Sequence, residues 1–281
     1  MACGDLITSS VLDCSNTIQG GVGDESRLTL ILKKDISAYT TDTLGRVTAI
    51  TLLAGKTAYS IDGIKQSLKP RYEMVQSPSG QSVYRHQADF FYFDYSQTHK
   101  NNIQAMGNGR YVAIFSNAKA DSNAFEVLGL DVGLEMTAAF RAPQENGGAF
   151  SITLSSPEGE FETKLPATFL STDYATSLAA INTLLALPTV SNVSPTAASA
   201  AGGTSLTFTG TNFFGGGSNS AVTGVAYVNQ STGAVVTQSS FTVASTTSIT
   251  CTSVAMTAGV YKVRVTTTKG VALSVINLIV S

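Results

Sequence analysis

The chain has 281 residues and a net charge of −2; only 13% of its residues are charged, while 43% are hydrophobic. This composition excludes a disordered chain, which needs low hydrophobicity and high net charge, and it lacks the basic excess of nucleic-acid-binding proteins. No apolar run approaches the roughly 18 residues of a membrane helix, and no signal peptide is expected. The three cysteines, Cys3, Cys14 and Cys251, predict reduced thiols because their number is odd and no C-x-x-C pair exists.

The first part of the chain is predicted to be mainly β. Residues 1–24 contain glycines without periodicity and are expected to form either a flexible arm that docks on a neighbour or a frayed terminus. Pro70 is expected to place its strand at a sheet edge or a bulge, because proline cannot donate to a ladder. Residues 35–46 are expected to be a surface loop, with a crossing to a neighbouring subunit as the alternative. Strands are predicted at 27–34, 47–52, 56–61, 67–75 and 84–93, with a tight turn at 54–55.

Two helices are predicted in this part. Residues 96–106 form a short one, with Ser96 as N-cap and Gly107 as C-cap. Residues 172–187 form the clearer one, with Ser171 or Thr172 as cap, and Pro188 ends it. Its apolar residues recur at spacings of four, three and four and therefore share a face: Tyr174, Leu178, Ile181 and Leu185. Between the helices, strands are predicted at 110–116, 124–130, 134–140 and 150–156, with a hairpin turn at 146–148.

Charge changes sharply after residue 187. Residues 188–281 contain three basic residues, Lys262, Arg264 and Lys269, and no acidic one. The first 187 residues therefore hold 14 basic and all 19 acidic residues, a net charge of −5. This shift predicts two domains, 1–187 and 188–281, with a junction near Pro188 and Pro195. In the second domain, strands are predicted at 205–209, 221–228, 234–243, 247–253, 260–267 and 272–280, a β-sandwich of immunoglobulin size.

Motifs of catalysis are missing from the sequence. There is no G-x-S-x-G nucleophile elbow, and the glycine-rich residues 215–218 lack the lysine of a phosphate loop. His86 and His99 stand thirteen residues apart, which matches no metal-ligand spacing. Residues 121–123 begin like a calcium loop but lack its later glycine and glutamate, so an ordinary turn is expected.

The remaining polar candidates predict no chemistry either. Asp89 and Asp94 flank an aromatic run and could form an acid pair, but no partner for acid–base work is evident. Asn192 and Asn229 match the glycosylation sequon, which is read as accidental without a secretion signal. The sequence therefore predicts no catalytic, cofactor-binding or metal-binding residue, no cofactor and no enzyme.

The second domain carries motifs of a known family. Residues 188–195 (PTVSNVSP) and 202–213 (GGTSLTFTGTNF) resemble the opening of an IPT/TIG Ig-like domain. Residues 247–251 (TSITC) and 258–265 (AGVYKVRV) are similar to its late strands. The resemblance covers residues 188–281 and implies an Ig-like module that binds surfaces or spaces domains, without catalytic residues.

The first domain resembles a phage major tail tube protein in the succession of strands at 111–117, 125–129, 133–138 and 148–154. This resemblance implies a β-sandwich or barrel-forming domain that is assembled in the host cytoplasm into stacked hexameric rings and is located in the tail of the virion. Implied partners are copies of itself, other tail proteins, genomic DNA that passes through the lumen without specific binding, and host glycans touched by the Ig-like domain. No membrane partner is expected. Residues 56–61 and 67–75 are expected near an acidic channel wall.

Two other structural or binding functions stay open at this point. One is a monomeric surface- or carbohydrate-binding adhesin whose Ig-like domain is the working part, and the other is a capsid decoration protein. The low charge, together with a positive mean hydropathy, favours assembly, because burial between subunits would cover neutral surface.

Overall fold

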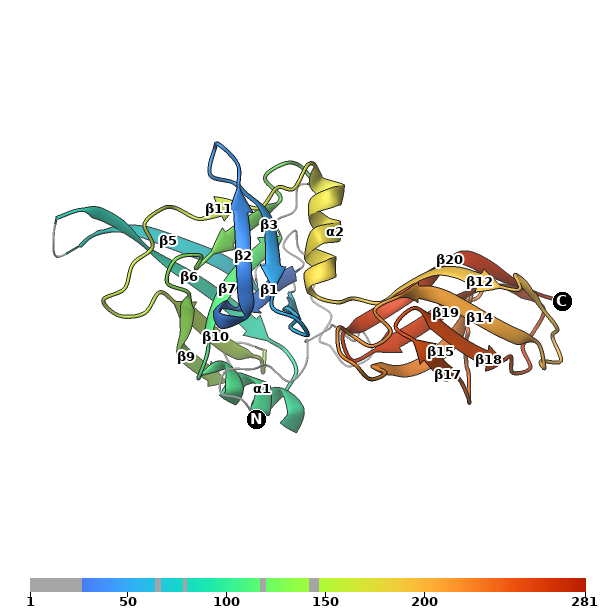
Figure 1. Ribbon diagram of the computed structural model, residues 1–281. Helices are drawn as coiled ribbons and strands as arrows, with labels where there is room; N and C mark the ends of the chain where they lie inside the picture. The colour runs from blue at the N-terminus through green and yellow to red at the C-terminus, as the bar shows by residue number, and fades with distance from the viewer. Residues whose placement is uncertain (1–26, 64–66, 78–79, 117–119, 142–146) are drawn as a thin grey trace. The chain divides into compact units, whose positions relative to one another are not determined.

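The computed structural model describes residues 27–63, 67–77, 80–116, 120–141 and 147–281 (Figure 1). The chain divides into two compact units, residues 1–185 and residues 186–281. Both are built mainly from β-strands, and the described residues of the first unit include two short helices, so the predicted fold class is confirmed. The predicted arm at residues 1–24, with Cys3 and Cys14, lies outside the described residues.

The described part of the first unit begins with β1 (Arg27–Leu32), a short 3-10 helix (Lys33–Asp35) and the hairpin of β2 (Ile36–Thr41) and β3 (Val47–Leu52). Its other described elements are β4 (Tyr59–Asp62), β5 (Leu68–Gln76), β6 (Ser82–Tyr92), α1 (Gln97–Met106), β7 (Arg110–Ser116), β8 (Phe125–Leu128), β9 (Leu134–Arg141), β10 (Phe150–Ser155), β11 (Ala167–Thr168) and α2 (Tyr174–Leu184).

Strand β7 lies at the centre of the main sheet. The sheet has the order β11-β8-β7-β9-β10-β6-β5, and β1 pairs with β7 and with β4. One side of β7 pairs with β1, while the other side pairs first with β9 and then with β8. The pairing with β9 consists of only Arg110 with Glu135 and Tyr111 with Leu134. The partner of β7 on this side therefore changes from β9 to β8 along the strand, at the turn that connects β8 to β9.

The continuous apolar sequence of β7 reflects burial on both faces of the sheet. Tyr111, Ala113 and Phe115 face the main core, which also holds side chains from β1, β6 and β10. Val112 and Ile114 are buried on the opposite face. Helix α2 lies beside β1 and β8, where the ring of Phe125 stacks on that of Tyr174 with centroids 5.5 Å apart.

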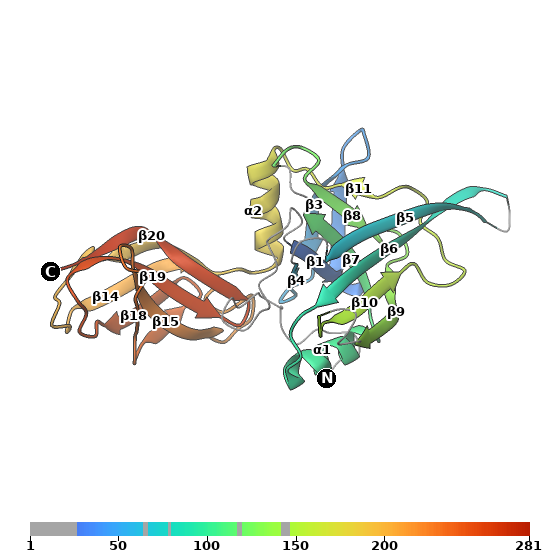
Figure 2. The same ribbon diagram turned by 180° about the vertical axis from the view of Figure 1, so that it is seen from behind.

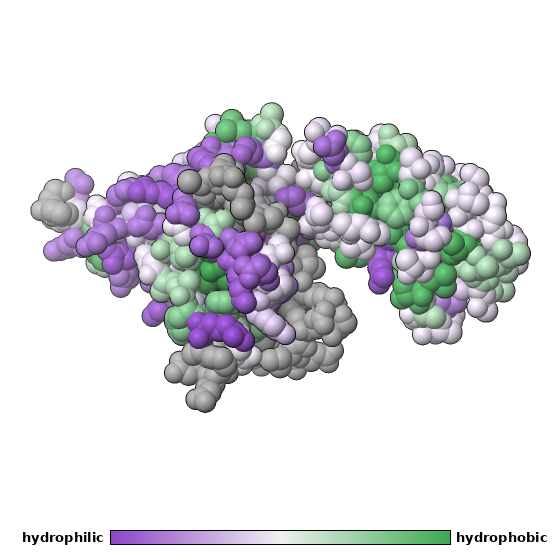
Figure 3. All heavy atoms as spheres, turned by 90° about the horizontal axis from the view of Figure 1, so that it is seen from below, coloured by the Kyte–Doolittle hydropathy of each residue, from purple (hydrophilic) through white to green (hydrophobic). Residues whose placement is uncertain are grey.

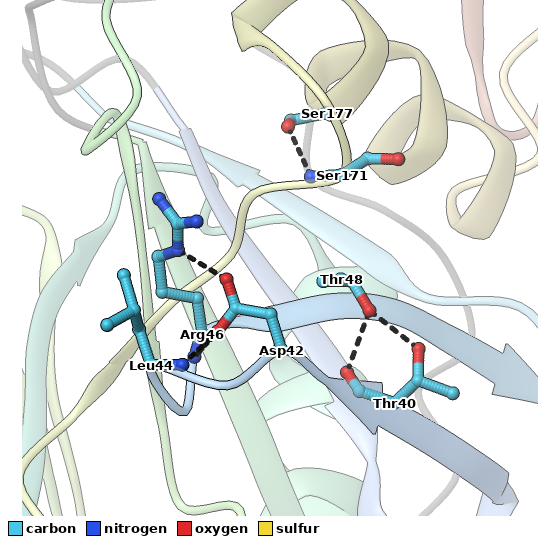
Figure 4. A network of polar contacts seen from close by, with 7 residues as sticks. All are labelled: Thr40, Asp42, Leu44, Arg46, Thr48, Ser171 and Ser177. Atoms are coloured by element: carbon cyan, nitrogen blue, oxygen red, sulfur yellow. Dashed lines mark hydrogen bonds and ion pairs between the residues drawn. The ribbon is translucent and has the colours of Figure 1, made fainter.

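The two helices begin at capped residues. Ser96 and Gly107 cap α1 as predicted. The second helix is shorter than expected at both ends. Asp173, and not Ser171 or Thr172, is its N-cap, and the carboxylate accepts the N–H of Thr176 at 2.7 Å. The helix ends at Leu184 with Leu185 as its C-cap, before Pro188, and Ala186 already has φ +51°. Ser177 Oγ accepts the N–H of Ser171 at 2.9 Å and so ties the preceding loop to the helix (Figure 4).

The second unit contains β12 (Thr189–Ser194), β13 (Ala197–Ala198), β14 (Ser205–Thr211), β15 (Val222–Asn229), β16 (Val235–Thr237), β17 (Thr242–Ser245), β18 (Ser248–Thr252), β19 (Gly259–Thr267) and β20 (Gly270–Val280). They pair in the order β16-β15-β19-β20-β12-β14-β18-β17, and β13 joins β20 (Figures 1 and 2). The two halves of this sheet enclose one core, which includes Phe208, Phe213, Tyr227 and Tyr261.

Two predictions about connections are wrong. Residues 36–41 form strand β2 and not a loop, because β-forming tyrosine and threonine side chains tolerate exposure on a two-stranded hairpin. The predicted turn at 54–55, in contrast, is present, and β4 after it pairs with β1. In the second unit, the expected strand 234–243 is divided into β16 and β17, which lie at opposite ends of the strand order.

Candidate assembly surface

Strands β9, β10, β6 and β5 form an antiparallel ribbon with two open edges. β10 pairs with both β9 and β6, and β6 pairs with β5. Among the described residues, no strand pairs with the outer edge of β5, or with β9 beyond Glu135. Pro70 thus lies in an edge strand, as predicted. Unpaired strand edges present rows of backbone donors and acceptors that another strand can join.

The hydrogen-bond pattern shows which residues of β5 face outward. The N–H of Phe91 donates to the carbonyl of Ser67, and the N–H of Ser77 donates to that of Gln81. Because hydrogen-bonded pairs alternate along an antiparallel ladder, the odd-numbered residues of β5 direct their backbone groups to β6. The even-numbered residues, among them Pro70, Tyr72 and Met74, direct theirs outward. The missing N–H of Pro70 therefore removes a donor from the open edge and none from the hairpin.

Large apolar side chains are exposed beside both open edges. On β5, Tyr72 is 49% exposed and Met74 is 65% exposed, although both follow the buried Leu68 on the same side of the strand. On β9, Phe140 is 51% exposed. The distal part of the β5–β6 hairpin extends beyond the rest of the first unit (Figure 2). The side of the hairpin that packs on the core near Leu68 is therefore exposed at Tyr72 and Met74, where the hairpin extends beyond the core.

The opposite face of the ribbon is polar, and Asp89 organises its charges. The carboxylate accepts Thr153 Oγ1 at 2.7 Å and Gln87 Nε2 at 2.8 Å, and it pairs with Arg71 at 3.3 Å. The Lys69 ammonium lies 5.9 Å from the centroid of the Phe91 ring. A hollow of about 540 Å³ on this face is lined by Ser67, Lys69, Arg71, Asp89, Phe90, Phe91 and Ser151.

A second hollow of about 630 Å³ lies in the first unit between the β2–β3 turn, the end of β8 and residues 162–168. In the turn, Asp42 accepts the N–H groups of Leu44 and Arg46, and its carboxylate lies 2.6 Å from Arg46 Nε (Figure 4). The hydrogen bonds to Arg46 are the main reason why the pKa of Asp42 is lowered. His86 and Glu162 also line this hollow.

The buried carboxylate of Glu162 holds the turn between β8 and β9. It accepts the N–H of Asp131 at 2.8 Å and that of Val132 at 3.1 Å. Asp131 in turn accepts the N–H and the hydroxyl of Thr163 at 3.0 and 2.6 Å. Burial raises the pKa of Glu162. Burial opposes ionisation of Asp131 too, but the two hydrogen bonds from Thr163 and the charges of Lys33 and Lys164 together lower the pKa of Asp131. These contacts are structural and leave no free acid–base pair.

The structure separates the other polar residues singled out in the sequence. Asp94 contacts His99 Nε2 at 2.9 Å, so it does not pair with Asp89. Asp121 accepts the N–H of Asn123 at 2.8 Å in a simple turn. In the second unit, Asn229 accepts the N–H groups of Ser231 and Thr232, while Asn192 is exposed. Gly215 is buried with φ +58° in a turn, and residues 216–218 after it are exposed, as expected of a surface loop.

The outer face of β19 and β20 is apolar and carries only positive charge. Its exposed aliphatic residues are Val260, Val271, Leu273, Val275 and Ile279. Lys262 and Arg264 stand between them, and Lys262 donates to the carbonyl of Val275. On the face drawn in Figure 3, hydrophilic residues gather on the first unit and hydrophobic or neutral ones on the second.

The half-buried Cys251 contacts the hydroxyl of Tyr227 at 3.5 Å.

Within the described ranges, no group of three or more His, Cys, Asp or Glu side chains could hold a metal ion. None of the helices described there is long and apolar enough to span a bilayer.

The IPT/TIG domain family matches residues 188–278, about a third of the chain. The second unit is therefore an IPT/TIG Ig-like domain, as its motifs predict. No curated protein matches the chain.

Solved structures match only distantly. A Bacteroides ovatus mixed-linkage glucan utilization locus protein, SGBP-B, in complex with a mixed-linkage heptasaccharide is 11% identical with a TM-score of 0.24; the match covers 99% of this chain and 70% of that one. The mouse coronavirus receptor-binding domain complexed with its murine receptor is 11% identical with a TM-score of 0.22, covering 92% and 87%. The mouse nectin-like molecule 4 ectodomain is 10% identical with a TM-score of 0.17, covering 91% and 89%. Scores this low carry no argument about function.

Proposed function

We propose that this chain is a structural virion protein, a tail tube subunit that assembles into stacked rings around a channel for DNA, with the Ig-like domain as an outward decoration. The observation that carries the proposal is the four-stranded ribbon β9-β10-β6-β5 with its two open edges. Joining β5 of one copy to β9 of the next would satisfy both edges and repeat around a ring, since heterologous contacts generate closed rings when their rotation closes.

The size of such a ring fits a channel. Barrels of about 16–18 strands already enclose an aqueous channel, and six copies with four strands each would give about 24 strands. The apolar face of the ribbon packs on the core of its own unit, so the polar face with Lys69, Arg71 and Asp89 would line the lumen. There the carboxylate of Asp89 compensates Arg71, which would limit the retention of passing phosphate groups.

This placement changes the expected channel wall. Of the two segments expected there, β5 belongs to the ribbon, but β4 lies elsewhere in the sheet and is buried through Ile61. The polar face of the β5–β6 hairpin carries Lys69, Arg71 and Arg85 against Glu73 and Asp89, so an acidic excess is not found on this face. The proposal therefore relies on paired charges and not on a negative lumen.

Proline substitution tests the edge directly. Met74→Pro removes an outward N–H from β5 without removing a donor from the hairpin, in the way that Pro70 already does. Met74→Ala is the matched control, because it shortens the side chain and keeps the N–H. We expect electron microscopy and sedimentation velocity to show rings or tubes for the native chain and for Met74→Ala, and dispersed single copies for Met74→Pro.

The result that overturns the proposal is equally clear. If the native chain stays a single copy at high concentration, or if Met74→Pro assembles as well as Met74→Ala does, the open edge of β5 does not hold subunits together. A native chain that stays monomeric would favour the adhesin alternative, in which the Ig-like domain is the working part. Circular dichroism and the thermal transition of each variant establish that loss of assembly is not loss of the fold.

A further inference from the structure

His86 is a buried histidine whose two ring nitrogens have different kinds of partner. The side chain is 2% exposed in β6. The N–H of Gly129 donates to Nδ1 at 3.2 Å, and Nε2 lies 3.0 Å from the carbonyl of Lys164. A backbone N–H can only donate and a carbonyl can only accept, so the partners assign a neutral ring with its proton on Nε2.

This ring joins three segments that other bonds also connect. Tyr84 and Glu162 exchange both backbone hydrogen bonds at 2.9 Å, and the N–H of Ser156 donates to the carbonyl of His86 at 2.9 Å. The Glu162 carboxylate binds the turn after Gly129, as described above. We call this set of contacts, made by His86, Gly129, Glu162 and Lys164, the clasp; it attaches residues 156–164 to β6 and to the β8–β9 turn.

We propose that His86 makes the clasp acid-sensitive, so that protonation of its ring releases residues 156–164 from β6. A second proton must occupy Nδ1, where it would face the N–H of Gly129 instead of an acceptor. The ring then loses one hydrogen bond and places two donors against each other in a buried site. A buried donor left without an acceptor is costly, so the closed clasp excludes the charged ring.

The charged groups around His86 oppose this effect only in part. Asp131 and Glu162 face it from the turn and from residues 156–164, together with Lys164, and Lys33 lies near both carboxylates. Asp42 and Arg46 line the same hollow. Burial lowers the pKa of His86 below its ordinary 6.5, and this effect outweighs both the hydrogen bond to the Lys164 carbonyl and the attraction of Asp131. Burial raises the pKa of Glu162, so acid also removes an anion that would favour the charged ring.

The direction of the pH effect follows from the lowered pKa of His86. The ring binds its second proton more readily when the clasp is open, so closure loses stability as the pH falls below 6.5. Opening would free the backbone of Tyr84, on the distal half of β6, and uncover the hollow beside it. The clasp therefore links mild acid to a new open edge on the β5–β6 hairpin.

His99 provides a matched control, because its partners tolerate protonation. Tyr92 lies 2.6 Å from Nδ1 and its hydroxyl can accept as well as donate, while the Asp94 carboxylate accepts from Nε2 at 2.9 Å. Burial lowers the pKa of His99 too. The two histidines thus share a direction of pKa shift and differ in whether the charged ring keeps its hydrogen bonds.

Hydrogen exchange of the full chain between pH 7.5 and 5.0 tests the proposal, after correction for intrinsic exchange rates. We expect the amides of Tyr84, Gly129 and Glu162 to exchange about fivefold to thirtyfold faster at pH 5.0. The upper figure applies if the His86 ring has its ordinary pKa of about 6.5 when the clasp is open and is never protonated when the clasp is closed. Amides in the core of the Ig-like domain are the internal reference. His86→Asn and His86→Gln, which cannot be charged, should abolish the increase, and His99→Gln should keep it.

Titration of the native chain by NMR gives a second measurement that needs no variant. It should find the neutral His86 ring protonated on Nε2, with a titration below 6.5 that coincides with the faster exchange. An unchanged exchange rate at pH 5.0, the same increase in both His86 variants, or a proton on Nδ1 in the neutral ring would each overturn the proposal.

Discussion

Glu160 and Glu162 are two residues apart, and the structure predicts opposite consequences for losing their charge. Glu162 is buried and its two oxygens accept the N–H groups of Asp131 and Val132. In Glu162→Gln the amide offers one acceptor oxygen and a donor, so one of the two partly buried N–H groups loses its acceptor and faces a donor instead. That loss costs about 1–3 kcal/mol of the free energy of unfolding.

Glu160 forms the shorter contacts of the two. Its carboxylate accepts hydrogen bonds from both terminal nitrogens of Arg110, at 2.7 and 2.6 Å, and both side chains are 43% exposed. Water can replace these bonds when either partner is removed, and exposed ion pairs contribute little to stability. We therefore expect Glu160→Gln to unfold at the same temperature as the native chain, within measurement error.

Differential scanning calorimetry distinguishes these cases. A loss of about 1–3 kcal/mol lowers the melting temperature of a domain of this size by roughly 2–12 °C, so Glu162→Gln should show a clear shift in the transition of the first unit. If Glu162→Gln is as stable as the native chain, or if Glu160→Gln loses more, the reasoning is refuted: relief from burying a charge would then outweigh the two backbone contacts.

Two further substitutions assign the calorimetric transitions. A Cβ at Gly210 would lie 1.8 Å from the carbonyl oxygen of Thr189, so Gly210→Ala must separate β12 from β14. We expect the melting temperature of the Ig-like domain alone to fall, by the equivalent of about 1–3 kcal/mol or more in the free energy of unfolding. An unchanged melting temperature would contradict the close approach. Leu30 is fully buried in the core of the first unit, so Leu30→Ala should lower the free energy of unfolding of that unit by about 2–5 kcal/mol, measured by calorimetry or urea titration. Equal shifts in both transitions would mean that the two units do not unfold separately.

Local signals in the sequence predicted the elements better than their partners. Ser96 and Gly107 marked the ends of α1, and Pro70 marked an edge strand, because caps and proline act through their own backbone. The turn at 54–55 was predicted, but the partner of the strand after it was not, because the pairing of β4 with β1 follows from the burial of Tyr59 and Ile61 in a distant core. The partner of a strand depends on burial against residues that are distant in the sequence, and a local sequence pattern does not contain that information.

The candidate surface was least visible in the sequence. Residues 137–141 of β9 carry Thr, Ala, Phe and Arg, a composition that does not differ from that of a strand paired on both sides. Its open edge follows only from the topology, in which β9 leaves β7 after two residue pairs. The clasp was hidden for a related reason: His86 is predicted on a strand, but its partners at Gly129 and Lys164 lie 43 and 78 residues away.

The brief contact between β7 and β9 has a mechanical consequence. Only two residue pairs join the backbone of the ribbon to the central strand, so side-chain packing, including that of Leu134 and Met136, sets the angle between the ribbon and the rest of its unit. Packing adapts more gradually than a hydrogen-bond ladder, which changes register in whole residues. The side chains along this seam would therefore determine the curvature of any larger surface that the ribbon helps to form.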